Sequence, residues 1–134
     1  MRIVIKFNML NIFDLIGRIF ISLIFLLSGF NKITNYEETI IWMESFGLPG
    51  FLLIPAIILE ITAPILIIVG YQVKVSATFL AIFCIGTAFI FHNDFSNQMQ
   101  FIAFMKNFAL AGGFLFLVLN GARDFSLDKK FKKK

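Results

Sequence analysis

The sequence predicts an all-α integral membrane protein, a bundle of four transmembrane helices. Its 134 residues are 59% hydrophobic and only 15% charged, whereas soluble domains carry about 25% charged residues. The apolar residues come in long runs that a small soluble core could not bury. Four runs approach the roughly 20 residues that cross the hydrocarbon of a bilayer, and they cover residues 13–33, 49–70, 75–91 and 101–120. We therefore expect a single transmembrane domain over residues 1–134.

Basic residues are divided unequally between the two sides of this predicted bundle. With the N-terminus in the cytoplasm, that side holds Arg2, Lys6, Lys74, Arg123 and the five lysines within 129–134. The other side holds one basic and four acidic residues, namely Lys32, Glu37, Glu38, Glu44 and Asp94. Basic loops stay in the cytoplasm, so we expect both termini there, with residues 121–134 as a basic tail beside anionic headgroups. Because the positive charge lies next to a hydrophobic span, we expect no nucleic-acid binding.

The segment between the first two spans has an amphipathic pattern. Within residues 36–46, apolar side chains alternate with acidic ones around Trp42. Tryptophan and a split between apolar and charged faces are typical of a short helix lying at the membrane surface. The alternative is an ordinary ordered loop. In either case the sequence Gly-Leu-Pro-Gly at 47–50 turns the chain into the second span.

Three charged residues fall inside the predicted spans, where charged side chains normally face a partner or a cavity. They are Arg18, Glu60 and Lys106. At a rise of about 1.5 Å per residue, Arg18 lies roughly 8 Å from the cytoplasmic boundary, Glu60 near the midplane, and Lys106 roughly 8 Å from the outer boundary. Since long side chains could reach the carboxylate from both directions, we expect Glu60 to pair with Arg18 or Lys106. The group forms either a functional polar site or a structural link between helices.

Three more polar residues lie near the outer ends of the spans, namely Lys32, His92 and Asn107. Lys32 is either a ligand-facing lysine or an interfacial lysine that reaches toward water. His92 is either a headgroup-level residue or a group for proton and ligand chemistry. A single histidine and a single cysteine, Cys84, exclude bis-histidine haem ligation and thiol exchange within one chain. We expect no metal site, and without a nucleophile–base pattern or a phosphate loop no catalytic residue is assigned.

Several short motifs follow one another in a fixed order along the chain. Residues 17–18 read Gly-Arg and residues 28–33 read Ser-Gly-Phe-Asn-Lys-Ile. Glu60 and Gly70 follow in the second span, and His92 ends the third. Residues 106–113 read Lys-Asn-Phe-Ala-Leu-Ala-Gly-Gly, and residues 124–128 read Asp-Phe-Ser-Leu-Asp. No single motif is specific, but the ordered set, over about residues 15–127, resembles the DoxX family of small four-helix membrane proteins.

The resemblance implies a link to membrane redox systems, because DoxX-like proteins include subunits described for quinol oxidase or thiosulfate:quinone oxidoreductase complexes. We therefore expect an accessory subunit of a quinone-linked redox system, whose polar core binds a quinone headgroup or another small ligand. We expect no intrinsic cofactor, and catalysis as part of an oxidoreductase would need a partner with its own cofactor. Carried over by position, the polar core consists of Arg18, Lys32, Glu60, His92, Lys106 and Asn107.

The sequence leaves a second hypothesis open, a structural or assembly subunit in which the buried charges only hold helices together. Both hypotheses require partners beyond the lipid bilayer, either other membrane or redox subunits or further copies of this chain. A small carrier or channel is a third possibility, and four helices per chain would then need to oligomerise. The high content of Ile, Phe, Lys and Asn is typical of an AT-rich genome, so we expect a bacterial inner (plasma) membrane.

Overall fold

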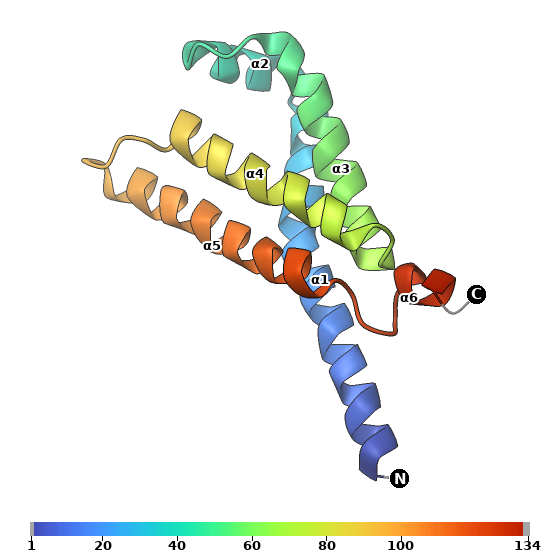
Figure 1. The fold of residues 1–134 in the computed structure, drawn as a ribbon. Coiled ribbons are helices and arrows are strands. Elements are labelled where there is room, and N and C mark those ends of the chain that lie inside the picture. The colour runs from blue at the N-terminus through green and yellow to red at the C-terminus, as the bar shows by residue number, and fades with distance from the viewer. Residues whose placement is uncertain (1, 133–134) are drawn as a thin grey trace.

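The structure is a computed structural model that describes the backbone of residues 2–132 and the side chains of residues 9–132. The described residues form six α-helices and one short 3₁₀ helix and contain no strand, and Figure 1 shows how the α-helices are arranged. In chain order they are α1 (Arg2–Thr34), α2 (Tyr36–Ser45), η1 (Gly50–Leu52), α3 (Leu53–Val69), α4 (Val73–Phe91), α5 (Gln98–Asn120) and α6 (Leu127–Lys132).

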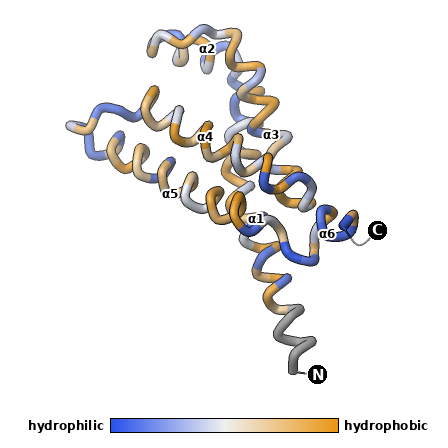
Figure 2. Tube along the Cα trace, in the orientation of Figure 1, coloured by the Kyte–Doolittle hydropathy of each residue, from blue (hydrophilic) through white to orange (hydrophobic). Residues whose placement is uncertain are grey.

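Four segments are long and apolar enough to cross a membrane, which confirms the predicted fold class. They are Met9–Thr34, Gly50–Val69, Val73–Phe91 and Gln98–Asn120. The fourth begins at Gln98 rather than at 101, because the side chain of Asn97 accepts hydrogen bonds from the backbone N–H groups of Met99 and Gln100 and caps the helix. Figure 2 shows hydrophobic residues along all four segments. Many large apolar side chains on them are exposed, as expected for surfaces that face lipid.

The four long helices form two pairs. α1 packs mainly on α3, α4 packs mainly on α5, and α3 also contacts α4. The pairs converge near α6 and diverge toward α2 and the loop between α4 and α5 (Figure 1). The hydrophobic core joins the two pairs, with the rings of Phe25 and Phe114 edge to face at 5.4 Å between centroids. Small residues of α4, Ala77, Ala81 and Cys84, complete this core and let its neighbours approach closely.

The predicted helix between the first two spans is α2, and it lies across the diverging end of the bundle (Figure 1). Trp42 stacks on Phe91 of α4 with 4.4 Å between ring centroids. Phe46 meets the same ring edge to face, and Met43 is buried. These apolar contacts fix α2 to α4, so the helix closes over the wedge between the pairs.

At the converging end, the segment after α5 folds back onto the turn between α3 and α4. Gly70 ends α3 with a left-handed φ of 78°, and a Cβ there would lie 2.2 Å from Cβ of Ser126. The N–H of Asp128 donates to the carbonyl of Gly70 at 2.8 Å, and its carboxylate accepts from the N–H groups of Gln72 and Val73 at the start of α4. The predicted tail 121–134 is therefore ordered as far as α6, and the last two lysines lie outside the described residues.

Candidate functional site

A cavity of about 540 Å³ lies between the diverging helix pairs. All four long helices contribute to its mostly apolar wall, and α2, η1 and Leu48 cover it at the diverging end. We call it the wedge cavity. Besides the indole of Trp42, it is lined by six polar side chains, namely Ser28, Lys32, Glu60, Thr87, His92 and Asn107. It therefore contains four of the six residues that the sequence proposed as a polar core.

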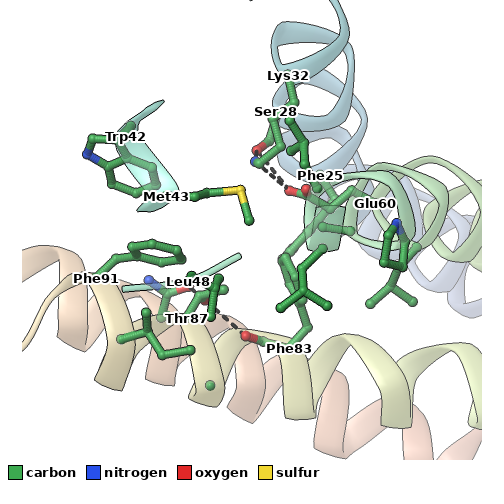
Figure 3. A pocket seen from close by; sticks show the side chains of 18 of the residues that line it. Phe25, Ser28, Lys32, Trp42, Met43, Leu48, Glu60, Phe83, Thr87 and Phe91 are labelled. Carbon is green, nitrogen blue, oxygen red and sulfur yellow. Dashed lines mark hydrogen bonds and ion pairs between the residues drawn. The ribbon is translucent and has the colours of Figure 1, made fainter. Parts of the chain in front are cut away.

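One wall carries an ion pair between α1 and α3. Nζ of Lys32 lies 3.1 Å from Oε1 of Glu60 and donates to Oγ of Ser28 at 2.6 Å. The hydroxyl of Ser28 donates to the same Oε1 at 2.9 Å, so two side chains of α1 contact one carboxylate oxygen (Figure 3). Glu60 is only 2% exposed, and its Oε2 has no hydrogen-bond partner among the described residues. This buried oxygen can accept a hydrogen bond from a ligand.

The local sequence explains why these groups meet. Ser28 and Lys32 are four residues apart, so they share a face of α1. Gly29 lies between them, and a Cβ built on it would lie 2.9 Å from Cδ1 of Ile61 and 3.3 Å from Cβ of Glu60. The missing side chain lets α1 approach α3 at the level of Glu60. Lys32 can then reach the carboxylate although it lies near the end of its helix.

The facing wall is built by α4 and α5. The hydroxyl of Thr87 lies 2.9 Å from the carbonyl of Phe83 and 3.4 Å from Oδ1 of Asn107. Nδ1 of His92 lies 2.8 Å from Oε1 of Gln100. An amide oxygen only accepts, so this contact requires Nδ1 to donate, and in that tautomer Nε2 has the free lone pair. The two walls thus present hydrogen-bonding groups from opposite sides of the cavity.

The wedge cavity is open toward the surroundings of the bundle. Ile24 of α1, Pro55 of α3 and Gly86 of α4 line the cavity and are also exposed. A Cβ built on Gly86 would meet no atom within 4 Å. All three residues lie within the candidate membrane-spanning segments, so this exposed part of the lining is at the level of lipid. A ligand could enter from the bilayer.

Arg18 belongs to a different, closed network at the converging end. It is 1% exposed, and Nη1 donates to the carbonyls of Ile67 and Ile68 at 2.9 and 2.8 Å. Nη2 donates to the carbonyl of Phe125, and Nε donates to Asp14 at 3.0 Å. The carbonyls of the last helical turn have no partner within the helix, and the planar guanidinium satisfies them. Arg18 thus links α1, the end of α3 and the segment after α5.

The expected pairing of Glu60 with Arg18 or Lys106 is therefore wrong. Arg18 is occupied by backbone carbonyls, and Lys106 is exposed, with no ion-pair partner among residues 9–132. Lys106 lies seven residues before Gly113 and so shares its face of α5. Gly113 approaches α1, whereas the helix pairs have diverged at the level of Lys106. The partner of Glu60 is Lys32, and the spacing of Ser28, Gly29 and Lys32 was the available signal.

In the described part of the chain, no group of three or more His, Cys, Asp or Glu residues could hold a metal ion. Cys84 is a buried free thiol in the hydrophobic core. Neither feature adds a reactive group to the wedge cavity. Its polar lining consists of one carboxylate, one ammonium, one imidazole, one amide, two hydroxyl groups and the indole of Trp42.

The sequence is similar to two proteins of Escherichia coli (strain K12). It is 38% identical to the inner membrane protein YqjF over 120 residues, which cover 90% of this chain and 92% of that protein. It is 36% identical to the inner membrane protein YphA over 123 residues, which cover 87% of this chain and 88% of that protein. No solved structure matches the chain. The DoxX family model matches residues 13–93. The match confirms the predicted family, and the motifs at 106–113 and 124–128 lie outside the matched range. The chain therefore belongs to the DoxX family and is a multi-pass protein of the inner membrane.

Proposed function

We propose that the wedge cavity binds the polar head of a quinone-like amphiphile and that the chain is an accessory subunit of a quinone-linked redox system. The observation that carries the proposal is the Oε2 atom of Glu60, a residue of the mostly apolar cavity wall. This atom is buried and has no hydrogen-bond partner among the described residues. Leaving such an acceptor unpaired costs about 1–3 kcal/mol or more. A ligand hydroxyl would satisfy it.

The polar groups of the two walls suit both oxidation states of such a ligand. A quinone has two carbonyl oxygens that accept hydrogen bonds, and the ammonium of Lys32 and the amide of Asn107 can donate to them. A quinol has two hydroxyl groups that donate, and Oε2 of Glu60 and Nε2 of His92 can accept. Glu60 and His92 would also take up the protons that quinol oxidation releases. The electrons would pass to a partner subunit with its own cofactor.

Size and access support the same ligand class. The volume of about 540 Å³ lies within the range of about 300–1,000 Å³ that is typical of small-molecule sites. The apolar wall would hold the ring, and the exposed lining residues Ile24, Pro55 and Gly86 leave room for an apolar tail to continue into lipid. A soluble, highly polar metabolite would fit this wall poorly.

A second candidate function is assembly of a membrane complex, and Lys106 favours it. This lysine is exposed within α5, and a lysine that faces lipid is unfavourable unless it reaches the interface or meets an acidic partner. A transmembrane helix of another subunit could supply that partner. The two functions are compatible, since an accessory subunit both binds its ligand and docks on its partner.

Fluorescence of Trp42 tests the quinone proposal directly. Trp42 is the only tryptophan and lines the cavity, so a bound quinone should quench it. We would titrate purified protein in mild detergent with a short-tailed benzoquinone, and identify co-purifying lipophilic molecules by mass spectrometry. Wild-type protein should show saturable quenching and retain quinone. Glu60→Gln and Lys32→Met should lower the affinity roughly tenfold, the effect of losing one hydrogen bond to a charged group.

Lys106→Met is the matched control, because it removes a lysine of the same membrane region that lies outside the cavity. It should bind quinone like the wild type. Equal affinity in the wild type and in the Glu60 and Lys32 variants would overturn the proposed site. Recovery of partner subunits without a bound quinone would favour assembly, and loss of those partners in Lys106→Met would assign that role to α5.

A further inference from the structure

A second cavity, of about 500 Å³, lies at the converging end of the bundle. It is formed by α1, the end of α5, the segment after α5, and α6. None of its lining residues also lines the wedge cavity. In contrast to the wedge cavity, its wall is mostly polar. The polar and charged side chains that line it are Asn11, Asp14, Asn120, Arg123, Asp124 and Lys129.

Several oxygen atoms of the residues that line this cavity can accept hydrogen bonds beyond those made within the protein. Asn11 is 2% exposed, and its Oδ1 has no hydrogen-bond partner among the described residues. Asn120 donates through Nδ2 to the carbonyl of Phe116, which leaves its Oδ1 as an acceptor. Asp14 accepts through Oδ2 from Nε of Arg18 and from the N–H of Arg123, so its Oδ1 can accept a hydrogen bond from a ligand. Several oxygen acceptors at one place indicate a ligand with several N–H donors, such as a primary ammonium group.

The charges of the lining residues indicate what else the ligand carries. The wall holds two carboxylates, Asp14 and Asp124, and two cations, Arg123 and Lys129. Asp14 also pairs with Arg18 at 3.0 Å, and the wall thus presents charges of both signs. A purely anionic ligand would meet the two carboxylates, and a purely cationic ligand would meet the two cations. A zwitterion with an ammonium and a phosphate group satisfies both, because arginine and lysine bind phosphate oxygens.

The position of the cavity indicates where such a ligand comes from. Asn11 lies two residues before the apolar run 13–33 that predicts the first span, and Asn120 is the last residue of the fourth span. The cavity thus lies at one membrane boundary, at the level of lipid headgroups. The apolar side chains of Leu10, Phe13 and Leu119 beside it are exposed and can pack against acyl chains.

We propose that this second cavity is a binding site for a phospholipid with a primary ammonium headgroup, phosphatidylethanolamine. The ammonium donates to Oδ1 of Asn11 and to the carboxylates of Asp14 and Asp124. The phosphate accepts hydrogen bonds from the side chains of Arg123 and Lys129. The bound lipid would hold the start of α1 against the segment that returns from α5.

The proposal is tested by native mass spectrometry of the full chain in an equimolar mixture of phosphatidylethanolamine, phosphatidylcholine and phosphatidylglycerol. The quaternary ammonium of phosphatidylcholine has no N–H donor, so phosphatidylethanolamine should be retained roughly tenfold more. Asn11→Leu and Asp124→Asn should each reduce this preference several-fold. Asn11→Leu is close in volume and needs no buried partner, and Asp124→Asn changes a partly exposed residue, so at least one variant should fold. Asp94→Asn, at the opposite end of the molecule, is the control and should keep the preference.

Equal retention of phosphatidylethanolamine and phosphatidylcholine by the wild type would overturn recognition of the ammonium. Preferential retention of phosphatidylglycerol would instead assign an anionic lipid and overturn the zwitterion. An unchanged preference in both folded variants would place the lipid elsewhere. Displacement of the lipid by millimolar O-phosphoethanolamine would assign the cavity to a soluble headgroup compound and overturn the lipid assignment.

Discussion

Gly29 of α1 and Glu60 of α3 lie so close that a Cβ on the glycine would come within 3.3 Å of the Cβ of the glutamate. This contact brings the two helices together at the wall of the wedge cavity. It also places Nζ of Lys32, one turn further along α1, 3.1 Å from the carboxylate. The ion pair therefore depends on a residue that contributes no side chain to it.

Replacing Gly29 by alanine should separate α1 from α3. The added methyl group would press on Ile61 and Glu60, and we expect the free energy of unfolding to fall by about 1 kcal/mol or more. Gly17→Ala is the matched control in the same helix, because a Cβ there meets nothing within 4 Å, and it should be neutral or slightly stabilising. Unfolding in mild detergent, followed by Trp42 fluorescence, measures both. Equal stabilities of the two variants would contradict the close packing at Gly29.

Removing Lys32 should be more damaging than removing the whole ion pair. Lys32→Met leaves Glu60 as an uncompensated buried carboxylate, at a cost of about 3–5 kcal/mol. Lys32→Met combined with Glu60→Leu should recover much of that loss, since no buried charge remains. A double-mutant cycle of unfolding free energies measures the coupling between the two residues. Additive effects would show that the pair contributes no coupling to stability.

The four spans could be predicted from the sequence, whereas the partner of Glu60 could not. Long apolar runs specify spans through their length alone, and counting residues placed Lys32 near a membrane boundary and Glu60 near the midplane. Counting residues in this way assumes that all helices run parallel to one another and begin at the same depth in the membrane. The actual register of α1 on α3 is set by the contact at Gly29, and the tertiary contact decides which charge the long lysine side chain reaches.

Arg18 illustrates a second limit of sequence reasoning. Its charge inside a span marked it correctly as a residue that needs partners, but three of those partners are backbone carbonyls. Every residue has a backbone carbonyl, so the sequence does not show which carbonyls accept these hydrogen bonds. Phe125 also lies 107 positions further along the chain than Arg18. The fold of the segment after α5, with α6 and the Asp128 cap, was missed for the same reason. The motif at 124–128 is part of the family pattern, but its residues alone do not predict this fold.

Replacing Arg18 by leucine should release the segment after α5. The carbonyls of Ile67, Ile68 and Phe125 would lose the guanidinium as a donor, and the hydrogen bonds between Asp128 and the start of α4 would open more often. Hydrogen exchange of residues 121–132 should rise at least about tenfold, the effect of roughly 1.4 kcal/mol of local stability. Lys130→Gln changes an exposed lysine of the same segment that lines neither cavity, and it should leave exchange unchanged. Unaltered exchange in Arg18→Leu would contradict the linking role.

The charge distribution predicts both termini in the cytoplasm, and cysteine labelling tests this orientation. With Cys84 replaced by alanine, single cysteines at Asp94 and at Lys130 would be exposed to a membrane-impermeant maleimide. We expect labelling at position 94 in cells whose outer membrane is permeabilised, and labelling at position 130 only after the inner membrane is disrupted. The reverse pattern would invert the topology and place the second cavity on the periplasmic side.

Filling the wedge cavity separates ligand binding from stability. Gly86 lines the cavity, and a Cβ there meets no atom within 4 Å, so Gly86→Phe can occupy the cavity without displacing a neighbour. We expect quinone affinity, measured by Trp42 quenching, to fall roughly tenfold or more, as for about 1.4 kcal/mol of lost binding energy. The unfolding midpoint should stay within a few degrees of the wild type.

Gly112→Phe provides the matched control for this experiment. A Cβ on Gly112 also meets nothing within 4 Å, but the residue lies outside the cavity wall. The two variants therefore add the same apolar side chain to open space on neighbouring helices. If Gly86→Phe bound quinone as tightly as Gly112→Phe, the ligand would not occupy the space beside Glu60, and the unpaired Oε2 of that residue would require another donor.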